Sequence, residues 1–346
     1  MSSPAQGMEA PAAPHPRETT TLFGHARGEQ ALLDAYRTGR VPHAWLIGGP
    51  PGIGKATLAY RMARFVLAYP ESASDAVGRA SSLALDPSHP VVRQVAGQAH
   101  PDLLVLERTE NDNGVLRTAI LVEQTERTVS FFGSTAGAGG WRVCIVDAAD
   151  ELNPASANKL LKVLEEPPRR ALFLLVSHAP GRLLATIRSR CRRLDLHALD
   201  TIDVARAAAL AVAADPHDAD VCAAAEAAHG SVSRALMLLG GPALALRQRL
   251  LSLLAALPAV DPMALHTLGD ALSRADDGAL TTFIDTVRDW LSARLHAEPC
   301  EPRRLARVAE VWEKVNSAAR EVEVFNLDRK PLVFAVFGLL AETARL

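Results

Sequence analysis

The sequence predicts an α/β protein in which a parallel β-sheet covered by helices is followed by two all-helical parts. Between residues 43 and 176, short apolar runs with the length of buried strands alternate with segments of helical periodicity. This alternation is typical of a parallel, doubly wound sheet with helices on both faces. Beyond about Leu199 no strand-like run occurs, and the Ala- and Leu-rich sequence has helical periodicity to its end.

The predicted N-terminal elements lead from a helix through a buried strand into a second helix. Residues 28–37 have helical spacing, with apolar side chains on one side. Residues 43–47 form an apolar run that stops at Gly48, the pattern of a buried strand entering a loop. In residues 56–68 apolar side chains recur every three or four positions, so a second helix is expected there.

Two more buried strands are predicted in the middle of the chain. They cover residues 102–106 and 143–146 and follow a stretch at 70–100 that has the composition of loops or short helices. The connection at residues 134–140 is Gly-rich, but it leads into a strand. A phosphate-binding loop would lead into a helix, so we expect a flexible surface connection there.

A proline-flanked helix and a last strand complete the predicted sheet region. Asn153-Pro154 opens the helix, Pro167-Pro168 closes it, and residues 172–176 form the strand. A break at Gly240-Gly241-Pro242 divides the helical remainder into two parts. The expected organisation is a disordered tail at 1–18, an α/β domain at 19–198, a small helical lid at 199–241 and a C-terminal helical domain at 242–346.

Composition excludes several classes of protein. The 346 residues include 37 basic and 39 acidic side chains, so there is no global basic field, and any contact with nucleic acid is local or shared. The four cysteines form no CxxC pair, which predicts reduced thiols, no zinc site and no disulfide framework. No apolar run approaches a membrane span, and the Pro-, Ala- and Ser-rich tail lacks the apolar core of a signal peptide. A cytoplasmic protein is expected.

A phosphate-binding loop is predicted between the first strand and its helix. The segment Gly49-Pro-Pro-Gly-Ile-Gly-Lys-Ala56 contains glycines at 49, 52 and 54 that let backbone N–H groups face phosphate. Lys55 is placed to reach the terminal phosphates. The hydroxyl that would hold Mg²⁺ is missing, because the eighth position is Ala56. Thr57 lies about 100° further round the helix and is a poor substitute.

Asp147 is the second candidate for nucleotide chemistry. It ends the strand at 143–146, where a P-loop enzyme places a carboxylate that helps to hold Mg²⁺. Ala148 follows it, so no catalytic base stands next to this carboxylate. Asp150 and Glu151 are the nearest acids that could replace one. Nucleotide binding as ATP or ADP therefore stays open, whereas efficient hydrolysis is not expected.

Several motifs together resemble the clamp-loader family of AAA+ proteins. They are Asn158-Lys-Leu-Leu-Lys-Val-Leu-Glu-Glu-Pro-Pro168, Leu183-Leu-Ala-Thr-Ile-Arg-Ser-Arg-Cys191, the His43-Ala-Trp-Leu strand and the loop from Gly49 to Lys55. The resemblance covers about residues 20–197. It implies a RecA-like P-loop domain, a helical lid and a C-terminal collar through which five subunits form a ring. The implied partners are the gamma/tau motor and delta subunits, the sliding clamp, and primed DNA held by the assembled ring.

The resemblance assigns a trans arginine to the Ser-Arg-Cys motif, which falls on Ser189, Arg190 and Cys191. Such an arginine reaches the nucleotide of the adjacent subunit, where a planar guanidinium stabilises charge on the transferred phosphoryl group. Residue type by itself favours a basic surface patch, because further arginines flank the motif. The resemblance also implies that Glu165 and Glu166 face a neighbour in the ring.

The expected function is therefore that of a largely non-hydrolysing clamp-loader subunit, without independent enzymatic activity, that donates Arg190. Two alternatives stay open. An active motor subunit would need Thr57 and either Asp150 or Glu151 to replace the missing groups, and a nucleotide-sensing scaffold would act outside replication. The lid also departs from hydrolysing relatives, because Gly230-Ser-Val-Ser-Arg234 places its arginine one position late.

Overall fold

A computed structural model describes residues 14–344 except 112, 113, 115, 134–139, 241, 276, 297–301 and 326. The chain divides into two compact units, an N-terminal unit that ends at Leu236 and a C-terminal unit that begins at Met237. This division falls within α10 (Val232–Leu239). None of the helices in the described part of the chain combines the length and the apolar character that a membrane span requires.

The predicted fold class is confirmed by a five-stranded parallel sheet in the order β2-β3-β4-β1-β5. Four strands match the predicted apolar runs: β1 (Ala44–Gly48), β2 (Leu103–Glu107), β3 (Arg142–Asp147) and β4 (Ala171–Ser177). The fifth, β5 (Arg192–Asp195), was not predicted. Its sequence Arg-Arg-Leu-Asp contains no apolar run, because it is a largely exposed edge strand that pairs only with β1.

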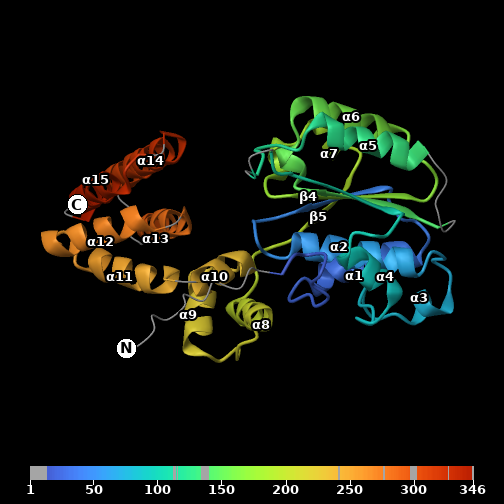
Figure 1. Cartoon of the computed structure of the whole chain (residues 1–346), viewed down its shortest axis with the longest axis horizontal. Helices are drawn as coiled ribbons and strands as arrows, with labels where there is room; N and C mark the ends of the chain where they lie inside the picture. The colour runs from blue at the N-terminus through green and yellow to red at the C-terminus, as the bar shows by residue number, and fades with distance from the viewer. Residues whose placement is uncertain are drawn as a thin grey trace, which may run out of the picture. The chain divides into compact units, whose positions relative to one another are not determined.

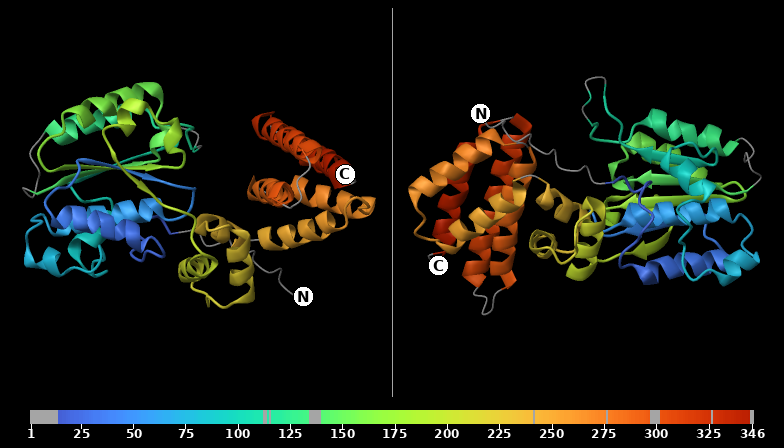
Figure 2. Two further views of the ribbon diagram at one scale, coloured as in Figure 1. Left: turned by 180° about the vertical axis from the view of Figure 1, so that it is seen from behind. Right: turned by 60° about the horizontal axis from the view of Figure 1, so that its bottom comes forward.

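Two helical layers cover the sheet (Figures 1 and 2). One face packs against α1 (Ala26–Arg37), α2 (Lys55–Ala68), α3 (Asp75–Arg79) and α4 (Pro90–Ala96). The other packs against α5 (Val122–Gly133), α6 (Pro154–Glu165) and α7 (Ala185–Arg188). Successive strand residues alternate between the faces, so that Ile47 contacts the α2 layer while Leu46 contacts the α6 layer. The sheet therefore separates two apolar cores.

The predicted tail lies partly outside the described residues, which begin at residue 14. Residues 14–18 form a turn near α2. The guanidinium of Arg64 anchors this segment, because Nη1 donates to the Thr19 carbonyl at 2.9 Å and Nη2 to the carbonyls of Pro16, at 3.3 Å, and Arg17. Burial, together with the nearby Arg61, lowers the pKa of Arg64 to about 10. The predicted flexible connection at 134–140 also lies almost wholly outside the described residues.

Three helices follow the sheet in the region predicted as a lid: α8 (Thr201–Val212), α9 (Ala219–Ala227) and α10. The side chains of Asp200 and Asp218 cap the first two by accepting hydrogen bonds from the N–H groups of Asp203 and Asp220. Leu199 N donates to the carbonyl of Gly230, which ties the entry of α8 to the turn before α10. This contact brings the start of α10 back toward the sheet domain.

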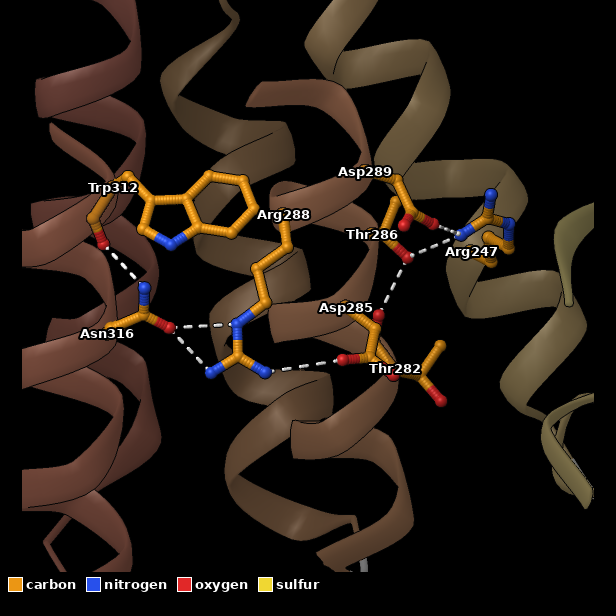
Figure 3. A network of polar contacts seen from close by, with 8 residues as sticks. All are labelled: Arg247, Thr282, Asp285, Thr286, Arg288, Asp289, Trp312 and Asn316. Carbon is orange, nitrogen blue, oxygen red and sulfur yellow. Dashed lines mark hydrogen bonds and ion pairs between the residues drawn. The ribbon is translucent and has the colours of Figure 1, made fainter. Parts of the chain in front are cut away.

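The C-terminal unit is a bundle of α11 (Ala243–Ala255), α12 (Pro262–Arg274), α13 (Asp277–His296), α14 (Pro302–Phe325) and α15 (Arg329–Ala344). A polar network crosses its apolar core (Figure 3). Arg247 of α11 pairs with Asp289 at 3.0 Å and also donates to Thr286 on α13. Arg288 of α13 donates to Asn316 of α14 at 2.9 and 2.6 Å. These contacts fix α11 and α14 against α13.

Candidate phosphate loop and arginine site

The predicted phosphate loop joins β1 to α2, as the sequence indicates. Two of its glycines are required by packing. Gly52 has a φ of +74°, and a Cβ there would lie 1.9 Å from Ser233 Oγ. A Cβ on Gly49 would lie 2.4 Å from the carbonyl oxygen of Leu196. Any side chain at either position would displace the loop from β5 or from the start of α10.

The carbonyl groups of the loop are bonded within the chain. Gly48 O accepts from Leu196 N at 2.8 Å, Gly52 O accepts from Val232 N at 2.8 Å, and Ile53 O accepts from His25 Nε2 at 2.7 Å. In contrast, within the described residues the N–H groups of Gly52, Ile53 and Gly54 meet no hydrogen-bond acceptor. These donors stand at the N-terminus of α2, where the helix dipole favours an anion. The loop geometry therefore fits a phosphate group.

Lys55 is directed at its own loop. Its Nζ donates to the Gly49 carbonyl at 2.8 Å and to the Pro50 carbonyl, and only 3% of the residue is exposed. Burial lowers the pKa of Lys55 to about 8, although the nearby Asp147 and Asp150 carboxylates partly oppose this shift. An ammonium group with a lowered pKa and carbonyl partners only would gain strongly from an anionic ligand.

The metal-binding half of the candidate nucleotide site is incomplete. Ala56 has no ligand atom in the position that would serve Mg²⁺. Thr57 is half-buried on α2, and its hydroxyl makes no hydrogen bond to any residue that the structure describes. Among the described residues, no three His, Cys, Asp or Glu side chains gather so as to hold a metal ion. The absence of zinc, which the sequence predicts, stays a prediction.

Asp147 stands at the end of β3, as predicted, among other acids. Burial, with contributions from Glu107 and Glu151, raises the pKa of Asp147 to about 6. Glu107 was missed by the sequence analysis, although its position one residue after a predicted strand indicates the same sheet edge. It is the register partner of Asp147 on β2. Lys55 acts in the opposite direction and lowers the pKa of Asp147, but burial and the neighbouring acids outweigh it.

Both acids that could replace a missing base are engaged elsewhere. Asp150 Oδ1 accepts from His178 N at 2.8 Å, beyond the end of β4. Burial raises the pKa of Asp150, but the bonds from His178 and Ser177 outweigh it, and the net pKa is lowered. Glu151 forms an ion pair with Arg108 at 2.9 Å. These contacts direct the two carboxylates away from the role of a general base.

Two serines that the sequence analysis did not single out lie against the loop. Ser231 and Ser233, at the start of α10, face Gly52 from the lid side, and Ser233 N donates to Gly52 O at 3.3 Å. No local pattern predicts this contact, because it joins segments about 180 residues apart. Arg234 N donates to Ser231 Oγ at 3.4 Å, so the displaced arginine belongs to a first turn that is packed onto the loop.

The second predicted group gathers at the ends of α6 and α7. Arg190 Nη2 pairs with Glu165 Oε1 at 2.8 Å, and Nη1 donates to the Thr186 carbonyl at 2.9 Å. Ser189 Oγ donates to the same carbonyl at 3.0 Å. Cys191 is partly covered by the α6-side core, and burial raises the pKa of its thiol to about 12.

The structure keeps Arg190 apart from the loop of its own chain. Its partner Glu165 ends α6, and Ile187 beside it belongs to the core on the α6 face, opposite α2. Within the described residues, no hydrogen bond or ion pair joins Arg190 to the segment from Gly49 to Lys55. Glu166, the other predicted interface acid, is exposed at the C-cap of α6.

Comparison with known proteins finds one matching family. The family described as "DNA polymerase III, delta subunit" matches residues 24–200. The DNA polymerase III subunit delta' of Pseudomonas aeruginosa is 40% identical over 149 residues, which cover 43% of this chain and 41% of the relative. The Escherichia coli subunit delta' is 35% identical over 163 residues, covering 47% and 45%. The Escherichia coli subunit tau is 27% identical over 185 residues, covering 54% and 26%. The matches thus span less than half the length of each of these relatives.

Proposed function

The chain belongs to the family of DNA polymerase III delta subunits, and delta-prime subunits are among its relatives; from this premise we propose that it is a stator of the clamp loader. In this role it does not hydrolyse ATP efficiently. It donates Arg190 to the nucleotide of a neighbouring motor subunit while a sliding clamp is loaded on primed DNA. The proposed neighbours are the gamma/tau and delta subunits in a five-membered ring.

The position of Arg190 carries this proposal. The guanidinium is held at the end of α6, on the sheet face opposite α2, so it does not contact the phosphate loop of its own chain. Its side chain is 34% exposed, and two of its five N–H groups are used within the chain. The remaining donors are available to phosphate oxygens of a second chain. Ser189, Cys191 and Glu166 would then border the contact.

The altered nucleotide site supports the lack of hydrolysis. Mg²⁺ would lose one protein ligand at Ala56, and no base follows Asp147 because residue 148 is alanine. The motor alternative requires Asp150 or Glu151 to activate water. In this chain the first is bonded to His178 and the second to Arg108, so that alternative has less support.

The loop nevertheless supports binding of a nucleotide through its phosphates. The N–H groups of Gly52, Ile53 and Gly54 would hold a phosphate, and Lys55 would exchange the carbonyls of its own loop for phosphate oxygens. Binding of a fluorescent ADP analogue tests this point. The wild-type chain should bind it and Lys55→Met should not, whereas equal binding by both would contradict a role for the loop.

The decisive experiment measures ATP turnover of the reconstituted loader with clamp and primed DNA. A trans arginine is worth a factor of about 10³ or more at the nucleotide that it serves. Arg190→Ala should therefore lower turnover and clamp loading of an otherwise assembled ring, whereas Arg188→Ala, an exposed arginine two residues away, should not. The isolated chain should not turn over ATP. Full turnover with Arg190→Ala, or hydrolysis by the isolated chain, would overturn the proposal, and failure to join the ring would favour a scaffold outside replication.

A further inference from the structure

Glu165 occupies a position that α-helices disfavour. It is the last residue of α6, followed by Glu166 and then by two prolines that end the helix. The C-terminus of a helix carries partial negative charge, so an acidic side chain there is repelled unless a cation neutralises it. That cation is Arg190, whose Nη2 lies 2.8 Å from Glu165 Oε1. The two residues are 25 positions apart and come from separate elements.

The guanidinium is also held from a second side. Nη1 donates to the carbonyl of Thr186 in α7 at 2.9 Å. Arg190 is therefore held by a carboxylate at the end of α6 and by a carbonyl within the short helix α7. A free arginine side chain loses rotamer entropy when it is immobilised. A guanidinium already held in place loses less of this entropy when it meets a ligand.

We propose that Glu165 is the positioning residue of Arg190, holding the guanidinium in the orientation in which its remaining N–H groups reach the neighbour's phosphate. This inference rests on the proposed trans role of Arg190. The ion pair leaves Nε and one N–H on each terminal nitrogen available for phosphate. Glu165 acts through Arg190 and does not itself touch the nucleotide.

The exposure of the pair sets the size of the expected effect. The side chains of Arg190 and Glu165 are 34% and 44% exposed, and ion pairs of this kind shift a population by a factor of about 1.5 to 5. Glu165→Ala should therefore lower the turnover of the assembled ring by about 2- to 5-fold. The KM for ATP should not change, because the nucleotide is bound by the neighbouring subunit. High salt should lower the turnover of the wild-type ring toward that of the variant.

Matched variants separate positioning from a structural effect. Glu165→Gln keeps an oxygen that accepts the hydrogen bond and should recover part of the loss. Glu123→Ala removes an exposed acid of α5 that has no ion pair within the described residues and lies outside the proposed contact, and it should behave as wild type. In an Arg190→Ala background, Glu165→Ala should have no further effect. A loss of turnover that persists without Arg190 would assign Glu165 a structural or direct interface role and overturn the inference.

A second readout uses the isolated chain and needs no ring. NMR relaxation of Arg190 ¹⁵Nε reports the order of the guanidinium on the picosecond-to-nanosecond timescale. Order should fall in Glu165→Ala and stay unchanged in Glu166→Ala, with thermal stability checked for each variant. Unchanged order in Glu165→Ala would refute positioning even where Arg190 acts in trans.

Unchanged ring turnover with Arg190→Ala would refute the trans role, whatever the order measurement gives. An increase in turnover with Glu165→Ala would mean that Glu165 competes with phosphate, and would also refute positioning.

Discussion

Replacing Lys55 with methionine should stabilise the protein at neutral pH, although Lys55 is the most characteristic residue of the phosphate loop. The ammonium group is 3% exposed and faces the carbonyl oxygens of Gly49 and Pro50. Its nearest acids, Asp147 and Asp150, only partly offset the cost of burial. Methionine has a similar length and no charge to bury, so the folded state should gain from the exchange.

The lowered pKa sets the magnitude and the pH range of this gain. A fall from the ordinary value of 10.5 to about 8 corresponds to about 3 kcal/mol of destabilisation while the group is charged. The two lost hydrogen bonds offset about 1–2 kcal/mol of it, which leaves a gain of about 1–2 kcal/mol. Because the folded pKa lies below the unfolded one, the penalty is complete below about pH 8. It disappears as the pH rises from there to about 10.5.

Calorimetry of the wild-type and variant chains at pH 7 and at pH 10 measures this effect. A gain of 1 kcal/mol raises Tm by about 2–4 °C in a unit of this size. Lys162→Met, at an exposed position of α6, is the control for the loss of a lysine charge. If Lys55→Met were less stable than the wild type at pH 7, burial of the Lys55 charge could not be the dominant effect. A gain that is as large at pH 10 as at pH 7 would also contradict this explanation.

Three further substitutions should change the free energy of unfolding, one by stabilising the chain and two by destabilising it. Asp147→Asn should stabilise the chain by about 1–2 kcal/mol at pH 8, because burial raises the pKa of Asp147 to about 6, and the gain should fade as the pH falls from 6 to 4. Asp150→Asn should destabilise the chain at pH 7, because the lowered pKa of Asp150 contributes stability that is lost only in acid, below about pH 3.8. If the stability of Asp147→Asn and of Asp150→Asn depended on pH in the same way, both pKa directions would be contradicted. Arg247→Ala should lower the stability of the C-terminal unit by roughly 3 kcal/mol, because it removes the partly buried ion pair with Asp289 at 3.0 Å. The exposed Arg249→Ala should not; calorimetry distinguishes the two, and equal Tm values would contradict a role of the network in Figure 3.

The part of the fold that the sequence predicts is the part whose signal is local. The strands at 43–47 and 172–176 are continuous apolar runs, because both faces of a parallel sheet are buried. β5 has no such run, since an exposed edge strand is defined by its pairing with β1. The helix α5 follows a polar stretch and was likewise not predicted. The position of α5 depends on its packing against α6, and the local spacing of apolar residues does not indicate this contact.

The candidate site divides in the same way. The sequence predicts that the glycines and Lys55 lie between a strand and a helix and that Asp147 ends a strand, and the structure has these elements at those positions, because motif spacing fixes them locally. Their role in binding stays a prediction. The ion pair of Glu165 with Arg190 and the contact of Ser233 with Gly52 join distant segments. Sequence reasoning could name Glu165 as an interface residue from a family resemblance. It could not identify its partner, because that depends on how α7 packs beside α6.

The packing of the phosphate loop limits what its glycine pattern can indicate about nucleotide binding. Gly49 lies against the Leu196 carbonyl, and Gly52 lies against Ser231 and Ser233, so both positions exclude a Cβ for reasons internal to the chain. A chain with this packing needs glycine at both positions whether or not it binds a nucleotide. Ala56 and Ala148 are the positions at which a hydrolysing P-loop protein would carry a metal ligand and a catalytic base. The glycine pattern therefore reports the fold, while Lys55, buried at a cost to stability, is the residue whose presence argues for an anionic ligand.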